Sequence, residues 1–228
     1  MKKIFSILYI ALLTSCTAQT SKIELTADEF ENAILKDMVQ VLDVRTKGEF
    51  NSGYIANALQ ADWNDKNEFE RRISFIDKKK PVYVYCLAGG RSAAAATKMR
   101  KMGFNVLELK GGINAWKATN KTLIGKTTEK QLSIEAYTNT ITGSKVVLVD
   151  FGASWCPPCK QMEPILQKVE KDLVGKFTLL KVDGGKDEEL VKLHNVTALP
   201  VFIIYKDGKE VWRKDGVASE EELKKALQ

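Results

Sequence analysis

Three of the four cysteines in the chain stand in settings where a sulfur atom could do chemistry. Cys156 and Cys159 are separated by two residues, a spacing that lets two thiols close a small disulfide and open it again. Cys86 is single and precedes the glycine-rich turn Gly89–Arg91, a setting that can hold a thiolate. The fourth, Cys16, ends an apolar N-terminal run. This distribution does not suit a framework of structural disulfides and indicates sulfur and redox chemistry instead.

The segment Trp155–Lys160 places its cysteine pair at a predicted strand-to-helix junction. A helix N-terminus stabilises a thiolate, so we expect Cys156 to be the exposed sulfur that attacks substrate disulfides and Cys159 to resolve the mixed disulfide. The two intervening prolines remove N–H groups that would help a thiolate, which leaves the reduction potential open. Zinc would need a second pair or several histidines, and His194 is the only histidine, so we predict no metal site.

The surroundings of this pair resemble those of thioredoxin, in the segments Val149–Phe151, Trp155–Lys160 and Thr197–Pro200. The resemblance implies that Asp150 is a buried acid that helps Cys159 lose and regain its proton, with Lys181 placed to neutralise it. An alternative role for Asp150 is that of a strand-end cap. The resemblance also implies that Pro200 is cis and faces the disulfide, while the backbone of Leu199 pairs with the substrate chain.

The turn Cys86–Arg91 lies between a predicted strand and a predicted helix. Backbone N–H groups of such a loop can point at the sulfur, and the helix adds its positive end. Gly89 and Gly90 permit the torsions that the loop needs, and Arg91 supplies a fixed charge and planar donors for an oxyanion. These features would stabilise a thiolate or persulfide on Cys86. The residues alone leave a second role equally open, that of a buried cysteine at a strand end.

The same region resembles the rhodanese sulfurtransferases, whose loop has the pattern Cys-x-x-Gly-x-Arg. Further matching segments are Leu42–Arg45, Glu49–Phe50, Gly53–Ile55 and Leu109–Trp116. The resemblance implies that Cys86 carries a sulfane sulfur as a persulfide, bound by Gly89–Arg91, and needs no cofactor. It also implies that Asp43 and Arg45 support the fold. Leu87 stands where thiosulfate-using members often have a basic residue, which argues against thiosulfate as the donor.

The N-terminal residues have the features of an export signal. A short positive start precedes Ile4–Leu13, which is apolar but too short to span a bilayer. The next segment, Leu13–Cys16, resembles the bacterial lipobox, so we expect residues 1–15 to be removed and Cys16 to carry a lipid anchor. Thr17 slightly favours the outer membrane, on the periplasmic side of the cell envelope. The alternative is a plain secretory signal with an incidental cysteine.

The elements that must position these sulfur atoms divide into two α/β domains, at residues 22–117 and 129–228, joined by a polar linker at 118–128. In the first domain we predict strands at 39–44, 81–85 and 106–109, and helices at 26–36, 92–102 and from 111. Their alternation predicts a mainly parallel sheet. The resemblance implies a thioredoxin fold for the second domain. Thr26, Thr46 and Ser219 each precede a glutamate by three residues, which predicts capping boxes.

These motifs together predict an exported thiol–disulfide oxidoreductase in which the Cys156/Cys159 dithiol discharges a persulfide on Cys86. The expected partners are a sulfane-sulfur donor or persulfide, disulfide-bonded envelope proteins and a membrane thiol electron donor. One alternative is a disulfide reductase whose first domain is only a binding module, and another is a non-catalytic envelope scaffold. The net charge is +6, but the basic residues are scattered, so we expect no nucleic acid partner.

Overall fold

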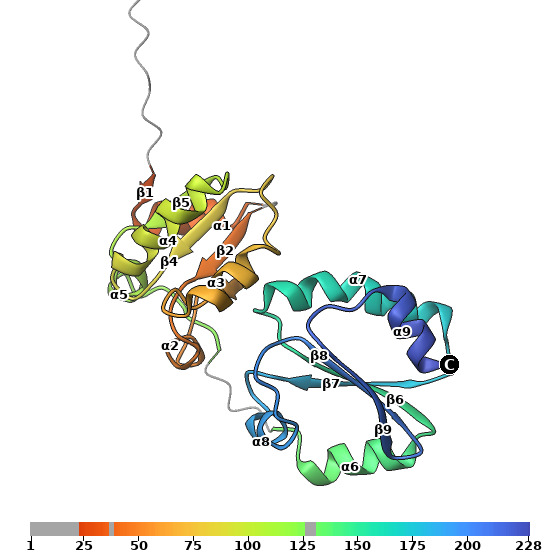
Figure 1. Ribbon diagram of the computed structural model, residues 1–228. Helices are drawn as coiled ribbons and strands as arrows, with labels where there is room; N and C mark the ends of the chain where they lie inside the picture. Colours follow the sequence, from red (N-terminus) through yellow and green to blue (C-terminus); the bar gives the residue numbers. More distant parts are fainter. Residues whose placement is uncertain (1–22, 37–38, 126–130) are drawn as a thin grey trace, which may run out of the picture.

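The computed structural model describes residues 23–36, 39–125 and 131–228, which form two domains lying side by side (Figure 1). The first domain contains, in chain order, β1 (Glu24–Leu25), α1 (Ala27–Ile34), β2 (Gln40–Asp43), α2 (Lys47–Asn51), β3 (Ala58–Gln60), α3 (Lys66–Ile73), β4 (Val82–Tyr85), α4 (Gly90–Lys101), β5 (Val106–Leu109) and α5 (Gly112–Ala118). The second contains α6 (Ile134–Gly143), β6 (Val146–Gly152), α7 (Pro157–Asp172), β7 (Thr178–Asp183), α8 (Glu188–Leu193), β8 (Val201–Lys206), β9 (Lys209–Asp215) and α9 (Glu220–Leu227).

The strands of the first domain form one parallel sheet in the order β1-β5-β4-β2-β3. Helices α1 and α5 cover one face of this sheet, and α3 and α4 cover the other. Because the strands are parallel, their carboxyl ends lie along one edge, which is where open α/β sheets bind their ligands. Cys86 directly follows β4 and Gln60 is the last residue of β3, so both lie at this edge.

The second domain has a mixed sheet in the order β7-β6-β8-β9. Strand β6 pairs parallel with β7 and antiparallel with β8. Helices α6 and α8 cover one face of the sheet, and α7 and α9 cover the other. The prediction of two α/β domains, the first with a parallel sheet, is therefore confirmed.

Local signals in the sequence set the beginnings of several helices. Thr26, Thr46 and Ser219 each accept a hydrogen bond from the backbone N–H three residues on, and the glutamate there accepts one from the cap residue. Each capping box satisfies two N–H donors at a helix start, and all three predicted boxes are present.

Three short elements were not predicted, namely β1, β3 and α3. The two strands have two and three residues, too few for an alternating pattern to appear. Helix α3 has only Phe69 and Ile73 as apolar residues among its eight. Helix α3 nevertheless helps to position the two domains, because it lies against α7 of the second domain (Figure 1).

The predicted linker, residues 118–128, is packed in part against the first domain. The Trp116 indole N–H donates to the carbonyl of Thr122 at 3.0 Å, which folds the chain back after α5. Ile124 then forms an antiparallel bridge with Tyr54, with N–O distances of 2.8 and 2.9 Å. The first domain therefore extends to Ile124.

The predicted export signal and its lipid site at Cys16 lie outside the described residues. Within the described part of the chain, no helix combines the length and apolar character that crossing a membrane requires.

Candidate active site

The cysteine pair of the second domain lies where β6 leads into α7. Cys156 is the N-cap residue of α7, its Sγ accepts a hydrogen bond from the N–H of Cys159 at 3.4 Å, and the two sulfur atoms form a disulfide. Pro157 and Pro158 occupy the start of the helix, where an N–H would have no partner within the helix. The sulfur of Cys156 is thus held at a helix N-terminus, a position that favours its thiolate when the disulfide opens.

Two further loops border the disulfide. The Leu199–Pro200 peptide bond is cis, as the resemblance implies, and Leu199 is buried. The turn Gly184–Gly185 packs close by, because a Cβ on Gly184 would lie 2.6 Å from the Leu199 side chain and one on Gly185 would lie 2.9 Å from the Trp155 indole nitrogen. Trp155–Cys156, Gly184–Gly185 and Leu199 thus form one surface, which we call the disulfide face.

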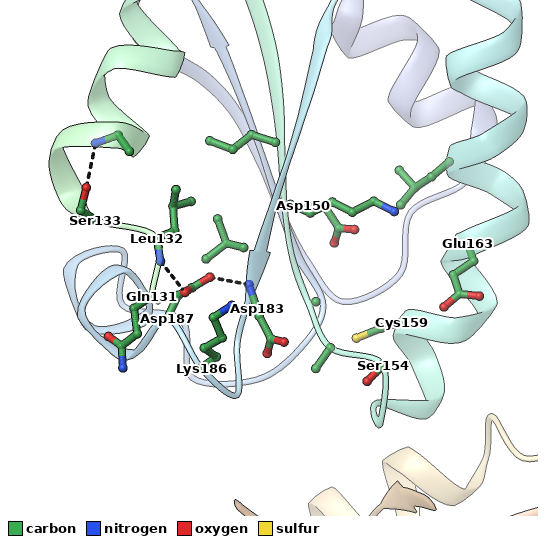
Figure 2. Close-up of a pocket in the computed structure, with 17 residues that line it drawn as sticks. Gln131, Leu132, Ser133, Asp150, Ser154, Cys159, Glu163, Asp183, Lys186 and Asp187 are labelled. Atoms are coloured by element: carbon green, nitrogen blue, oxygen red, sulfur yellow. Dashed lines mark hydrogen bonds between the residues drawn. The ribbon is translucent and has the colours of Figure 1, made fainter. Parts of the chain in front are cut away.

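Asp150 lies on a pocket of about 680 Å³ that Cys159 also lines and Cys156 does not (Figure 2). Burial raises the pKa of Asp150 to about 6, while the charge of Lys181, its neighbour on β7, acts in the opposite direction. Asp150 lies inside β6 rather than at its end, which excludes the role of strand-end cap. A carboxyl that exchanges its proton near neutral pH, on the same pocket as Cys159, suits an acid–base partner of that cysteine.

Cys86 of the first domain is 1% exposed, and its own loop surrounds the sulfur with hydrogen-bond donors. The N–H of Gly89 lies 3.1 Å and the hydroxyl of Ser92 3.4 Å from Sγ. Burial raises the pKa of Cys86, but hydrogen bonds from the Ser92 hydroxyl and from the N–H groups of Ser92, Gly89 and Ala88 outweigh it, so the pKa is lowered. Of the two roles that the sequence left open, this geometry favours the reactive thiolate.

Ser92 and Gly112 also build this site and are not among the residues predicted for it. Gly112 has φ +60°, and a Cβ there would lie 2.5 Å from the carbonyl oxygen of Cys86. The next residue, Ile113, donates its N–H to that carbonyl at 2.8 Å. The available signal for Ser92 was a lone hydroxyl in the first turn of an alanine-rich helix.

Arg91 has a protein partner that was not predicted. Its guanidinium forms two hydrogen bonds with the carboxylate of Glu49, at 2.6 and 2.7 Å, and this pairing lowers the pKa of Glu49 to about 2. The capping box of α2 holds Glu49 in place. The structure therefore orients Arg91 through a carboxylate of its own domain, and the charge of Arg91 also interacts with Cys86.

The two glycines predicted for this loop, Gly89 and Gly90, differ in backbone conformation. Gly89 has φ +110°, which favours glycine, whereas Gly90 begins α4 and a Cβ there meets nothing within 4 Å. The loop therefore requires glycine at Gly89 and not at Gly90.

Asp43 and Arg45 form a buried ion pair at 2.5 Å, and Arg45 also donates to the carbonyl of Gly53, which fits their predicted support of the fold.

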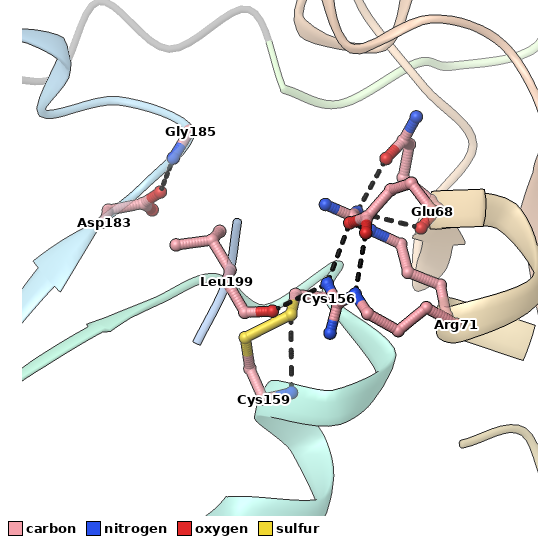
Figure 3. The surroundings of a disulfide bond; sticks show 9 residues. Glu68, Arg71, Cys156, Cys159, Asp183, Gly185 and Leu199 are labelled. Carbon is pink, nitrogen blue, oxygen red and sulfur yellow. Dashed lines mark hydrogen bonds and ion pairs between the residues drawn. A yellow bond between two sulfur atoms is a disulfide. The ribbon is translucent and has the colours of Figure 1, made fainter. Parts of the chain in front are cut away.

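The prediction that Cys156 is exposed is wrong, because its exposed fraction is 0% whereas that of Cys159 is 8%. The first domain covers the disulfide face (Figure 3). The Trp155 ring packs 5.6 Å from the ring of Phe50, and the Arg72 guanidinium lies 5.2 Å from the Trp155 ring centroid. The expectation rested on the second domain alone and took no account of the surface that the first domain contributes.

Four hydrogen bonds between described residues join the two domains. They run from Gln60 N–H to Trp155 O at 2.8 Å, from Lys47 Nζ to Gly184 O at 2.9 Å, from Asn51 Nδ2 to Gly185 O at 3.4 Å and from Arg71 Nη2 to Leu199 O at 2.9 Å. Every donor belongs to the first domain and every acceptor is a backbone carbonyl of the disulfide face. The hydrogen bonds from the first domain therefore all end on the backbone of the disulfide face.

The disulfide face and Cys86 lie at the same edge of the first sheet. Asp43, at the end of β2, is in register with Tyr85 of β4 on one side and Gln60 of β3 on the other. Cys86 follows Tyr85, and Gln60 bonds Trp155. Two strand spacings, about 10 Å, therefore separate β4 from the strand that meets the disulfide face. The structure brings the two sulfur sites together on one edge, with β2 between them.

His194 has the surroundings of a packing residue. Its ring lies 4.9 Å from that of Tyr137 and 5.4 Å from that of Phe151, and burial lowers its pKa. Across residues 23–36, 39–125 and 131–228, no group of three His, Cys, Asp or Glu side chains is arranged to hold a metal ion.

Comparisons with known proteins match each domain separately. Residues 26–119 match the family model of the rhodanese-like domain, and residues 128–228 match the thioredoxin model. A thioredoxin of Chlamydia trachomatis is 38% identical over 84 residues, which cover 37% of this chain and 81% of that protein. Thioredoxin Y of rice chloroplasts (Oryza sativa subsp. japonica) is 43% identical over 79 residues, or 35% of this chain, so the chain spans about half (47%) of that relative. A solved rhodanese-related protein from Thermoplasma volcanium is 27% identical, with 45% of this chain and 98% of that one covered and a TM-score of 0.41.

Proposed function

The chain belongs to the thioredoxin family and carries a rhodanese-like domain ahead of its thioredoxin domain, and we propose on this basis that it is a thiol–disulfide oxidoreductase working with a sulfur carrier on the same chain. Cys156 and Cys159 form the dithiol. Cys86 carries the sulfane sulfur, and the dithiol discharges it as sulfide.

The proposed cycle has three steps at sulfur. The Cys86 thiolate takes a sulfane sulfur from a donor and becomes a persulfide. The Cys156 thiolate attacks the outer sulfur, which forms a new S–S bond and releases the Cys86 thiolate. Cys159 then attacks Sγ of Cys156, closing the disulfide and expelling hydrosulfide. The dithiol supplies the two electrons that reduce the sulfane sulfur, and an external dithiol donor must reduce the disulfide again.

The shared sheet edge is the observation that carries this proposal. Cys86 lies at the carboxyl end of β4, and the loop of Cys156 contacts the carboxyl end of β3, two strands away. A short chain connection between two such sites gives effective concentrations in the millimolar range, on the order of 1 mM. A transfer between them then needs a small movement of one domain over the other rather than a collision of two proteins.

We also propose export and a lipid anchor at Cys16, on the periplasmic side of the envelope. This part rests on the residue pattern of the first sixteen positions. The partners proposed with it are a sulfane-sulfur donor, disulfide-bonded envelope proteins and a membrane thiol electron donor.

Sulfide release after persulfide loading tests the coupling. The protein is loaded at Cys86 with a small persulfide donor, its Cys156/Cys159 pair is reduced, and sulfide is followed with time. We expect rapid release in the native chain and none in the Cys156→Ser variant beyond the rate of a Cys86→Ala control. Equal rates in the native chain and in Cys156→Ser would refute the coupling.

The reduction potential of the Cys156/Cys159 pair tests the direction of electron flow. It is measured with Cys86→Ala present, so that the third thiol does not interfere. We expect a value near that of thioredoxin, about −270 mV, which allows the dithiol to discharge a persulfide. A value of about −120 mV, typical of a strong oxidant, would contradict the proposed cycle, because such a dithiol is a weak reductant.

The alternative function is a disulfide reductase whose rhodanese-like domain only binds a partner. The pairing of Arg91 with Glu49 favours it, because the carboxylate neutralises much of the charge that was predicted to bind an anion. A cyanide assay with several sulfane-sulfur donors separates the two functions. Thiocyanate formation that disappears in Cys86→Ala supports the sulfur carrier, and its absence with every donor supports the binding module.

A further inference from the structure

We propose that the rhodanese-like domain is a built-in cap on the disulfide face, held by Arg71 on the carbonyl of Leu199, and that disulfide-bonded proteins reach Cys156 only when the cap moves away. The inference rests on the thioredoxin half of the proposed function and does not need the sulfur half. It begins with the complete burial of Cys156, the sulfur expected to meet substrate.

The acceptor used by Arg71 is the group that a substrate chain requires. By the resemblance to thioredoxin, the backbone of the residue before Pro200 pairs with the substrate. Here the carbonyl of Leu199 already accepts a hydrogen bond from Arg71 Nη2 at 2.9 Å (Figure 3). A carbonyl oxygen can accept two hydrogen bonds, but Arg71 and the helix that carries it lie over the disulfide beside this carbonyl, so a substrate chain can pair there only after they move.

The cap offers Arg71 in a fixed orientation. The carboxylate of Glu68 accepts from Arg71 Nε at 2.7 Å and from Nη2 at 2.8 Å, and it accepts from Arg72 Nε at 2.5 Å. Arg72 in turn donates to Gln60 at 2.7 Å, and its guanidinium lies over the Trp155 ring. This network aligns α3 over the disulfide, because each arginine is held by partners within the cap.

The contacts are suited to reversible docking. The hydrogen bonds between the domains end on backbone carbonyls, which accept from water equally well once the cap moves away. Lys47 and Asn51 of α2 hold the Gly184–Gly185 turn, and Phe50 between them packs on Trp155. Phe50 joins the buried apolar cluster around Trp155, while the side-chain hydrogen bonds that cross between the domains are only partly buried. An interface with this share of polar contacts is typical of domains that can move relative to one another.

The covered state still leaves the disulfide open to small thiols. Cys159 is 8% exposed and lines the pocket of about 680 Å³ beside Asp150, whose lining residues all belong to the second domain (Figure 2). A small dithiol that enters this pocket reaches the Cys159 sulfur without displacing Arg71. The cap therefore discriminates by size, since it excludes protein substrates and admits small reductants.

The test compares the Arg71→Ala variant with a control variant at a second arginine, both in the full-length protein. Arg100→Ala is the control, because Arg100 also bonds a backbone carbonyl, that of Val106, within the first domain. In the reduced proteins, the rate of iodoacetamide modification at Cys156 is followed by peptide mass spectrometry. We expect Arg71→Ala to raise this rate about fivefold, the effect of losing one hydrogen bond, and Arg100→Ala to leave it unchanged. Loss of a nearby positive charge disfavours a thiolate, so charge alone would slow the reaction.

Lys47→Met provides a second variant that removes a different bond of the cap. It should accelerate Cys156 modification as Arg71→Ala does, and both variants should accelerate insulin reduction while leaving the reduction of the disulfide by dithiothreitol unchanged. Equal modification rates at Cys156 in the native chain and both variants would overturn the cap. Faster modification with no insulin reduction by any form would leave the cap standing and contradict the oxidoreductase function instead.

Discussion

The two sulfur sites have the same position between a strand and a helix, but the groups that surround each sulfur come from different parts of the chain. Cys86 and Cys156 each follow a strand and precede a helix, so each sulfur lies near backbone N–H groups. The donors around Cys86 all come from its own loop and the first turn of α4, within six residues of the sulfur. The surroundings of Cys156 come from loops far apart in the sequence and from a second domain.

This difference indicates different uses of the two sites. A sulfur carrier must stabilise one charged sulfur, which a short loop achieves by itself. A disulfide exchanger must admit and release a partner chain, and its surface is therefore open to competition from any group that bonds the same carbonyls. In this chain, the rhodanese-like domain is that competitor.

Reciprocal loss of activity is the strongest test of the division between the sites. Cys156→Ser should lower insulin reduction by about 10³-fold or more, because the attacking sulfur is gone, and leave thiocyanate formation unchanged. Cys86→Ser should do the reverse. If either variant lost both activities while remaining folded by circular dichroism, the two sites would not be separable.

The close packing behind the Cys86 loop gives the next largest effect. Gly112→Ala forces a Cβ against the backbone of Cys86 and Leu87 at a positive φ, which should destabilise the first domain by about 3 kcal/mol or more and abolish sulfur transfer. Gly90→Ala, in the same loop, meets no atom within 4 Å and should behave like the native chain. Urea unfolding and the cyanide assay measure both, and equal effects of the two substitutions would contradict this geometry.

Beside the Cys156/Cys159 disulfide, the ionised carboxylate of Asp150 lowers the stability of the folded domain at neutral pH. Its folded-state pKa of about 6 exceeds its ordinary value of 3.8, so ionisation disfavours the native state as pH rises from about 4 to 6 and above. Asp150→Asn should therefore stabilise the oxidised second domain at pH 7 by up to about 3 kcal/mol, and the gain should vanish at pH 4. It should also slow turnover, since Cys159 loses its proton acceptor. Urea unfolding at both pH values checks the sign, and a gain that persists at pH 4 would be inconsistent with this origin.

Among the effects that compare the two sulfur sites, the smallest concerns the hydroxyl beside Cys86. Ser92→Ala removes a hydrogen bond to the sulfur, so the pKa of Cys86 should rise, and alkylation at pH 7 should slow by about tenfold. Thr97→Ala is the control, because that hydroxyl bonds the Ala93 carbonyl within α4. The pH dependence of iodoacetamide modification gives both values. An unchanged profile in Ser92→Ala would assign thiolate stabilisation to the backbone alone.

The same contrast explains what could be predicted from the sequence. The Cys86 loop is local, so its glycine at Gly89 and its position between strand and helix were accessible from neighbouring residues. The partner of Arg91 was not, since Glu49 lies forty-two positions away. The capping boxes were visible because they span four residues.

The covered disulfide could not be predicted for the same reason. Arg71 lies in α3, a helix with too few apolar residues to show a period, and its partner Leu199 is 128 positions distant in the other domain. No pattern within either domain specifies a contact between them. Only the arrangement of the two sheets shows that the edge carrying Cys86 meets the disulfide face.

The dilution dependence of persulfide discharge tests the central claim most directly. Chain loaded at Cys86 and reduced at Cys156/Cys159 is followed for sulfide release over a hundredfold range of protein concentration. Transfer within one chain predicts a first-order rate constant that is the same at every concentration. A rate constant that falls in proportion to dilution would show that the dithiol discharges persulfides of other molecules and that the shared edge has no part in the reaction.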